Sequence, residues 1–175
     1  MGYVQKNIMI IRCTQKLFKE LKQKPANGEP VNNLLWSWHS NVFHIERRKC
    51  VLLTNDETLF SMFIPGLKGS DFKIFNIIFG QKLFKTLLAE EIPQDQIETV
   101  LSECENIQYE KTNNRSVLGT MNEQKFQIEY SIQSEGGLAQ TDIFELNRFI
   151  NRNRLSAIDY KYPVEIFREK LKIAT

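Results

Sequence analysis

Both histidines of the chain lie in one short stretch, residues 36–50, which reads WSWHSNVFHIERRKC. An imidazole has an unperturbed pKa near neutral pH, about 6.5, so His39 is a candidate general acid or base. Arg48, or its neighbour Arg47, could then stabilise the negative charge that develops on a phosphate during cleavage. These residue types predict the chemistry of a small metal-independent ribonuclease or toxin-like hydrolase. His39 also suits a second role, as a partly buried histidine in a β-sheet.

The spacing of the histidines argues against a metal site. His39 and His44 are five residues apart, so in a regular strand their side chains point to opposite faces. The cysteines, Cys13, Cys50 and Cys104, are far apart, form no C-x-x-C pair and have apolar neighbours. That pattern predicts reduced thiols in the core. We therefore expect no bound metal and no other cofactor.

Polar side chains that could bind bases and phosphates recur along the chain. In the segment LNRFINR, Asn147 and Asn151 are one helical turn apart, as are Arg148 and Arg152. Asparagine is a poor helix former, so the pair needs a reason to be there. Its amides either satisfy backbone groups of neighbouring segments or form a polar surface that recognises bases and phosphates. The binding candidates are Asn41, Arg47, Lys49, Asn55, Asn122, Asn147, Arg148, Asn151 and Arg152, with Arg154 as a further source of charge.

Charge is distributed unevenly although the formal net charge is only +2. The excess of Lys and Arg over Asp and Glu is +6 in residues 1–50, −8 in residues 51–145 and +4 in residues 146–175. One interpretation is that the basic ends pack against the acidic middle with their charges solvated or paired. The other is a basic surface built from both ends, which would favour an anionic partner.

The candidate residues around His39 are predicted to lie on strands. An apolar run over 8–13 has strand length and precedes a short helix that Thr14 can cap. Three further apolar runs over about 36–64, separated by ERRK and TNDE, indicate an antiparallel meander. A two-residue turn at Arg47-Arg48 would set its register. The cross-strand pairs would then be Glu46 with Lys49, Asn41 with Thr54 and His39 with Asp56.

Most of the remaining chain is predicted to be helical. Residues 71–89 carry a wide apolar face, which indicates a central core helix. Pro93 and Pro163 each suit the first turn of another helix, and Thr141 or Asp142 can cap one between them.

One segment, residues 116–134, fits the helical and the strand period equally. We favour a helix there because Ser116 can cap it and Gly136-Gly137 can end it. Residues 107–112 alternate like a strand. The predicted fold is α+β, with the meander and an N-terminal strand packed against several helices.

Length and composition limit the kind of protein. With 175 residues, 42% of them apolar, the chain can bury one sizeable core, so we expect one domain over residues 1–175. No run approaches the roughly 18 apolar residues of a membrane span, and the N-terminus lacks the features of a signal peptide. We therefore expect a cytoplasmic protein that does not associate with a membrane; the sequence does not indicate its oligomeric state.

Six motifs occur in a characteristic order over nearly the whole chain. They are WHSN (38–41), ERRKCVL (46–52), NDETLF (55–60), TNNRSVLGTMN (112–122), LNRFINR (146–152) and YKYPVE (160–165). In this the chain resembles a bacterial family of unknown function with the motifs W-H-x-N, R-R-K-C, N-x-x-T, S-V-L-G-x-M-N and Y-x-Y-P. The chain departs from that pattern at Arg154, where the family has a proline. The resemblance implies a family and leaves the function open.

Three hypotheses about function follow. The leading one is a binding or regulatory module whose basic surface engages nucleic acid or an acidic protein. The second is the hydrolase that uses His39, and the third is an accessory subunit in which the Asn and Trp side chains are structural. A convergence of His39, Asn41, Asn55, Asn122 and Asn147 on one concave surface would favour a site.

Overall fold

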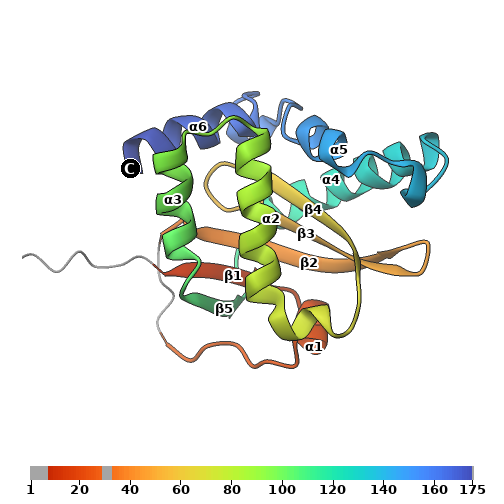
Figure 1. Ribbon diagram of the computed structural model, residues 1–175, viewed down its shortest axis with the longest axis horizontal. Coiled ribbons are helices and arrows are strands. Elements are labelled where there is room, and N and C mark those ends of the chain that lie inside the picture. The colour runs from red at the N-terminus through yellow and green to blue at the C-terminus, as the bar shows by residue number, and fades with distance from the viewer. Residues whose placement is uncertain (1–7, 29–32, 175) are drawn as a thin grey trace, which may run out of the picture.

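The computed structural model describes residues 8–28 and 33–174. Its strands form one sheet in the order β4-β3-β2-β1-β5 (Figure 1). β1 is parallel to β2 and to β5, whereas β2, β3 and β4 are antiparallel neighbours. The strands are β1 (Met9–Cys13), β2 (Ser37–Ile45), β3 (Arg48–Asn55), β4 (Ser61–Leu67) and β5 (Ile107–Lys111). The predicted α+β fold, with its meander and N-terminal strand, is confirmed.

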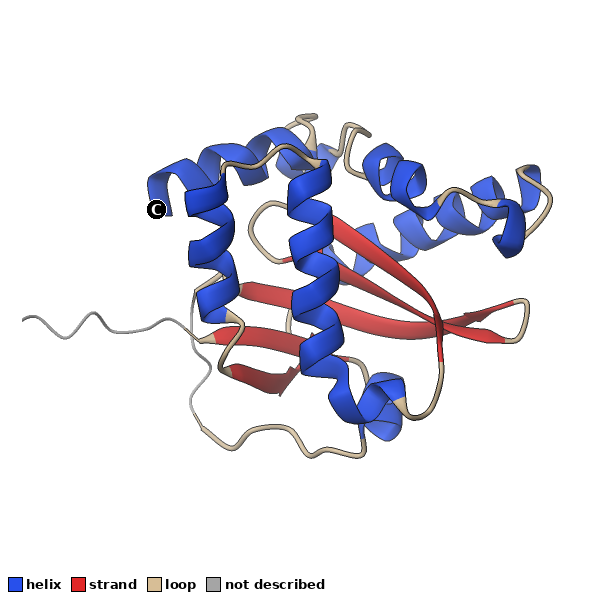
Figure 2. Cartoon of the chain, viewed as in Figure 1, coloured by secondary structure: helices blue, strands red, loops and turns tan. Residues whose placement is uncertain are grey.

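Helices cover both faces of this sheet (Figure 2). They are α1 (Gln15–Leu21), α2 (Phe75–Ala89), α3 (Gln94–Glu103), α4 (Arg115–Ser134), α5 (Ile143–Ile150) and α6 (Pro163–Ala174), with a short 3-10 helix η1 (Asp71–Ile74) before α2. In Figure 1, α2 and α3 lie in front of the sheet and α4 lies behind it. Within the described ranges, no helix is long and apolar enough to cross a membrane. The N-terminal residues used in the argument against a signal peptide lie mostly outside those ranges.

The ambiguous segment 116–134 belongs to the helix α4, as favoured. Its cap is Asn114 rather than Ser116, because the Asn114 side chain accepts hydrogen bonds from the backbone N–H groups of Ser116 and Val117. The strand-like alternation was misleading, since Phe126 and Tyr130 point to solvent. Ile128 and Ile132, which also fit the helical period, are the residues that are buried.

The predicted turn between β2 and β3 was wrong by one residue. Ile45 pairs with Arg48, so the turn consists of Glu46 and Arg47, which have φ angles of 48° and 64°. Both angles fit a type I′ turn, whose twist matches that of the strands. The register moves with the turn: Asn41 pairs with Leu52, Lys49 with His44, and His39 with Thr54 instead of Asp56. Because the shift is equivalent to two residues along one strand, every side chain keeps the predicted face.

The two faces of the sheet bury separate clusters of apolar side chains. The larger cluster lies under α2, α3 and α6 and includes Trp36 and Trp38. The smaller one lies between the sheet and the helices α4 and α5, toward the β2–β3 turn. Alternate residues of β2 divide between them, as the period of a strand requires: Val42 joins the first cluster, Phe43 and Ile45 the second.

Helix α2 is not the central core helix that its wide apolar face indicated. Phe75, Phe79 and Leu83 are buried against the sheet, whereas Ile77 and Leu88 remain about half exposed, at 50% and 48%. The sheet covers one side of the helix, and α3 and α5 also contact it, but Ile77, Phe84 and Leu88 stay partly exposed. An apolar stripe is therefore left on the surface of α2.

Candidate functional site

A row of polar side chains crosses the sheet on the face that α4 covers. Each strand contributes one residue, and the register aligns Glu110, Arg12, His39, Thr54 and Ser61 in that order from β5 to β4. All of these side chains are buried. Directly opposed residues share a face of the sheet, so these side chains lie side by side in one line across it. We call these residues the polar row.

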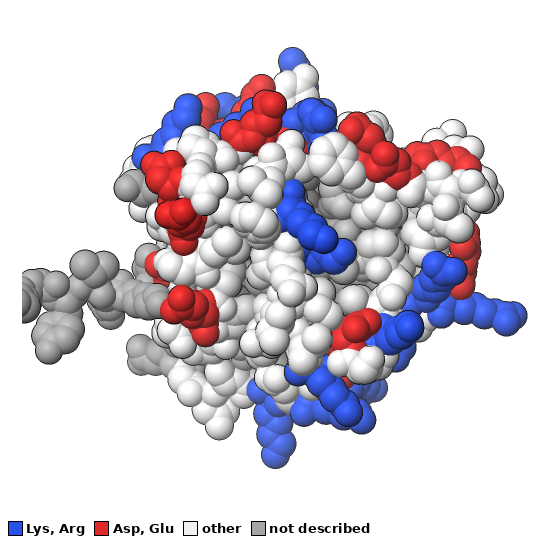
Figure 3. All heavy atoms as spheres, in the orientation of Figure 1, with Lys and Arg blue, Asp and Glu red and all other residues white. Residues whose placement is uncertain are grey.

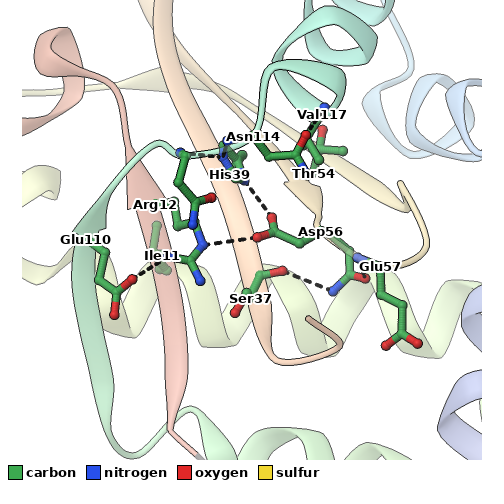
Figure 4. Close-up of polar contacts among 12 residues, drawn as sticks. Ile11, Arg12, Ser37, His39, Thr54, Asp56, Glu57, Glu110, Asn114 and Val117 are labelled. Carbon is green, nitrogen blue, oxygen red and sulfur yellow. Dashed lines mark hydrogen bonds and ion pairs between the residues drawn. The ribbon is translucent and has the colours of Figure 1, made fainter. Parts of the chain in front are cut away.

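Arg12 lies between two carboxylates in this row (Figure 4). Its Nε is 3.1 Å from Oδ2 of Asp56, and its Nη1 donates a hydrogen bond to Oε2 of Glu110. Glu110 also accepts a 3.0 Å hydrogen bond from the side chain of Gln108. Burial of a charge costs free energy unless the charge is paired, so each of these groups depends on the others.

Both ring nitrogens of His39 are engaged within the protein. Nδ1 is 2.6 Å from Oδ1 of Asp56, and Nε2 lies 3.2 and 3.3 Å from the backbone nitrogens of Asn113 and Asn114 (Figure 4). Because those backbone groups can only donate, Nε2 accepts, and the ring proton is on Nδ1. The neutral ring thus joins β2 to the start of α4. It is fully buried and has no nitrogen left for a substrate.

Asp56 reaches His39 from just beyond the end of β3. Its backbone N–H donates to the carbonyl of Ser37, which places Asp56 diagonally across from His39 on the same face. The sequence predicted this contact as a directly opposed pair. The two residues do meet, through a different register.

The β4 end of the polar row is joined to α4 by Gln124. The hydroxyl groups of Thr54 and Ser61 are 2.8 Å apart, and Oε1 of Gln124 accepts from both, at 3.2 and 2.8 Å. Its Nε2 is buried and has no hydrogen-bond partner among the residues that the structure describes. The polar row therefore holds α4 against the sheet at a position where the apolar cluster does not extend.

A hollow of about 630 Å³ opens at the other end of the row, beside β5. Arg12 and Glu110 line it together with Lys24, Lys111 and Asn113. The chain that forms its outer wall is fixed to the edge of β5, where the Ala26 N–H donates to the carbonyl of Tyr109 at 2.8 Å.

A second hollow, of about 490 Å³, lies next to the first and shares Pro25, Lys111 and Thr112 with it. Phe18 and Lys19 of α1 line its far side. The two hollows lie side by side between the polar row and α1 and are bordered by lysines; together we call them the depression.

Exposed cations gather at the same end of the molecule. In Figure 3, Lys and Arg side chains concentrate at the lower right, around α1 and the β2–β3 turn, while acidic side chains lie mainly at the left and top. None of the cations in this group forms an ion pair with a described residue. We call this group the basic end: Lys16, Lys19, Lys22, Lys24, Arg47, Arg48, Lys68 and Lys73.

A protein-family model for a domain of unknown function, DUF6933, matches residues 10–166. The chain belongs to the DUF6933 family. Searches of the curated proteins and of the solved structures found no significant match. The resemblance to a family of unknown function is confirmed, and the function has to be argued from the site itself.

In this DUF6933 domain, two of the predicted binding asparagines close the free edge of the sheet. Asn151 accepts from the N–H of Ser61 at 2.7 Å and donates to its carbonyl at 2.8 Å; Asn147 does the same to Phe63, at 2.7 and 3.2 Å. Four residues of helix rise about 6 Å and two residues of strand about 6.6 Å, so the spacings match. Both side chains are used within the protein.

Asn55 is likewise occupied by the DUF6933 fold. It is buried, its Oδ1 accepts from the backbone and hydroxyl of Thr58, and its Nδ2 donates to the carbonyl of Leu35. This geometry explains the N-x-x-T motif as a turn between β3 and β4. Asn41 accepts a 2.9 Å hydrogen bond from Thr14, and Asn122 is exposed on α4. The asparagines and His39 therefore do not converge on one concave surface.

The predicted cations fall into two groups. Arg47 and Arg48 belong to the basic end, and Lys49 beside them forms a 2.6 Å ion pair with Glu20 of α1. Arg148 and Arg152 lie on or next to α5 instead. Arg152 binds the buried Glu90 with two hydrogen bonds of 2.9 and 2.5 Å, which raise the pKa of its guanidinium. One continuous surface built from both chain ends is not formed.

Arg154, the position at which the sequence is expected to depart from the motif pattern, is exposed. Its Nε donates to the hydroxyl of Tyr162, and its guanidinium lies over that ring. Arg154 thus places a cation near the end of α5, away from the basic end.

The cysteines show no sign of reactivity. Burial raises the pKa of all three thiols, that of Cys104 to about 12, so they stay protonated at neutral pH. Among the described residues, no group of three or more His, Cys, Asp or Glu side chains could hold a metal ion.

Sequence reasoning missed Arg12, Glu110 and Gln124. Arg12 did carry a signal, because a charged residue inside the apolar run IMIIRC needs a buried partner. Its partner Glu110 is 98 residues away, and Gln124 lies on a helix whose orientation depends on the fold. No local pattern links these three residues.

Proposed function

We propose that this DUF6933 domain is a binding module that engages single-stranded nucleic acid through the basic end. The observation that carries the proposal is the set of exposed cations that converge from α1, the β2–β3 turn and the loop before η1 without ion pairs to described residues. Such a cluster costs free energy through mutual repulsion, and a chain of phosphates removes that cost by releasing counterions.

The neighbouring depression favours single strands over a duplex. Its lysines, Lys19, Lys24 and Lys111, are spaced along the border, where they can contact successive phosphates. Phe18 and Pro25 offer apolar surface for an unstacked base, and the Asn113 amide can hydrogen-bond to a base edge. A duplex keeps its bases stacked and could not enter hollows of this size.

The hydrolase alternative has less support from the geometry. A general base needs a free nitrogen within reach of the substrate, whereas His39 is buried with both nitrogens engaged. In our proposal the polar row supports the depression from below, and Arg12 and Glu110 form part of its floor.

A salt series tests the proposal. Labelled single-stranded RNA and DNA oligonucleotides are titrated with the full chain, and binding is followed by fluorescence anisotropy. We expect the logarithm of the affinity to fall linearly with the logarithm of the salt concentration. Lys19→Glu combined with Lys24→Glu should weaken binding roughly tenfold or more at low salt, since two phosphate contacts become repulsive.

Lys161→Glu combined with Lys172→Glu is the matched control, because it reverses the same number of charges at exposed positions outside the basic end. Binding that does not respond to salt, or an equal loss in the control and the paired variant, would contradict the proposal.

His39→Gln separates binding from hydrolysis. Gln can keep the acceptor near Asn113 and Asn114, so oligonucleotide affinity should stay within about twofold of the wild type, and neither protein should cleave RNA. RNA cleavage by the wild type that disappears in a folded His39→Gln variant would instead establish the hydrolase.

A further inference from the structure

A groove separate from the basic end lies between α2 and α5. It encloses about 230 Å³, and residues 62–65 of the edge strand β4 form its floor. Ala89 of α2 and Phe144 of α5 extend the apolar walls. The space-filling view shows this region as a hollow with basic side chains lying beside it (Figure 3). The groove thus combines an apolar floor with a charged border.

The border of the groove is basic. Lys82, Lys85 and Arg148 line it, and neither lysine forms an ion pair with a described residue. Nε of Arg148 is shielded from solvent without a hydrogen-bond partner among the described residues. The one carboxylate in the lining, Glu90, is buried and already bound by Arg152 and Arg168. Charge complementarity therefore favours an acidic ligand.

The floor cannot accept an added β-strand although β4 is an edge strand. The outward backbone groups of Ser61 and Phe63 are taken by Asn151 and Asn147, and Pro65, two residues further along, has no N–H to offer. Main-chain pairing with a partner strand is blocked along this edge. A partner must instead insert side chains, as an amphipathic helix does in an apolar groove.

The size of the groove fits anchoring side chains. Its volume is below the roughly 300–1,000 Å³ of pockets that enclose small ligands. On its wall, the ring of Phe144 stays half exposed, at 50%. This exposed ring provides apolar contact area that a helix of a partner would cover.

We propose that the groove between α2 and α5 docks an acidic amphipathic helix of a partner protein. Its apolar face would insert large side chains over residues 62–65, and its carboxylates would pair with Lys82 and Lys85, since Arg148 already lies 3.7 Å from Glu145. This site is distinct from the basic end, so the domain could hold a nucleic acid and a protein at the same time.

Two display libraries of helix-forming peptides test the proposal against the immobilised full chain. Both randomise the apolar positions i, i+3, i+4 and i+7; one has Glu on the polar face and the other has Lys. We expect enrichment from the Glu library alone, with Leu or Phe at the anchoring positions. Enrichment from both libraries to the same extent, or from neither, would overturn the proposal.

The most enriched Glu peptide is then titrated into purified variants. Phe144→Ala and Lys85→Glu should each weaken its binding roughly tenfold or more, since one removes an apolar wall and the other reverses a charge. Lys172→Glu, whose side chain does not line the groove, is the control and should stay within about twofold. Groove variants that bind as tightly as the wild type would overturn the proposal.

A competition experiment separates this site from the proposed nucleic-acid site. The peptide should remain bound in the presence of a saturating oligonucleotide, and Lys85→Glu should retain oligonucleotide binding. Displacement of the peptide by the oligonucleotide would overturn the assignment of the groove to a protein helix.

Discussion

On the α2 face of the sheet, Trp38 packs edge-on against Phe60, Phe79 and Phe167, with ring centroids 5.9–6.5 Å apart. On the α4 face, the next residue of the same strand, His39, binds Asp56 and two backbone N–H groups. The first face is held by contacts that have little directionality, and the second by hydrogen bonds that require defined partners. The two faces should therefore respond differently to substitution.

The largest difference is expected for Arg12→Met. This substitution leaves Asp56 and Glu110 buried without their cation, and breaking a buried pair in this way costs about 3–5 kcal/mol of stability. Urea denaturation measures the loss. Arg12→Met combined with Glu110→Gln should recover part of it, because one uncompensated charge is removed. A double variant that is less stable than Arg12→Met alone would contradict the paired arrangement.

A smaller effect is expected on the apolar face. Phe79→Leu removes part of a buried ring but leaves no polar group unsatisfied, so it should cost about 1–2 kcal/mol. The same urea denaturation checks this value, provided that the substitution leaves unchanged the slope of the unfolding free energy against urea concentration (the m-value). A loss equal to that of Arg12→Met would show that the two faces do not differ as proposed.

A substitution in the turn of the β2–β3 hairpin, whose strands contribute to both faces, should increase stability. Arg47 has a φ of 64°, a conformation that glycine adopts without a steric cost. Arg47→Gly should raise the free energy of unfolding by about 0.5–1 kcal/mol, which a shift in the urea midpoint would reveal. Arg48→Gly, inside β3, is the matched control and should be destabilising.

A further effect concerns a polar group at the margin of the apolar face and appears only at alkaline pH. Burial raises the pKa of Tyr109 to about 12, from 10.0 in the unfolded chain. Unfolding then releases a proton between these values, so stability should fall as the pH rises from about 10 to about 12. Tyr109→Phe should reduce this fall. Urea denaturation over this pH range measures the stability of both proteins. An equally steep loss of stability in Tyr109→Phe would contradict the role of Tyr109.

Local patterns predicted most of the elements because burial repeats with the period of each structure. The helix near Pro163 and the strand at 107–112 follow from apolar spacing and from Pro at a first turn. The turn at residues 46–47 was misplaced because the sequence there contains no Asn-Gly pair to mark it. Even so, the predicted faces were correct, since a strand has a period of two.

The roles of the polar side chains were harder to predict from the sequence. Asn147 on α5 and Asn151 just after it suggested either a binding surface or backbone capping. The choice depended on whether an edge strand lay opposite them. The position of β4 beside α5 follows from the packing of the whole sheet. The role of the two asparagines could therefore not be predicted from the sequence of the helix alone.

The sequence by itself determined the helices, the strands and the two faces of β2, because these features depend on residues within a few positions of one another. Only the tertiary structure brought Arg12, His39 and Glu110 into one row and placed the lysines of separate segments around one depression. These contacts join residues up to 98 positions apart. They exist because strands distant in the sequence pair side by side, and local periodicity does not specify that pairing.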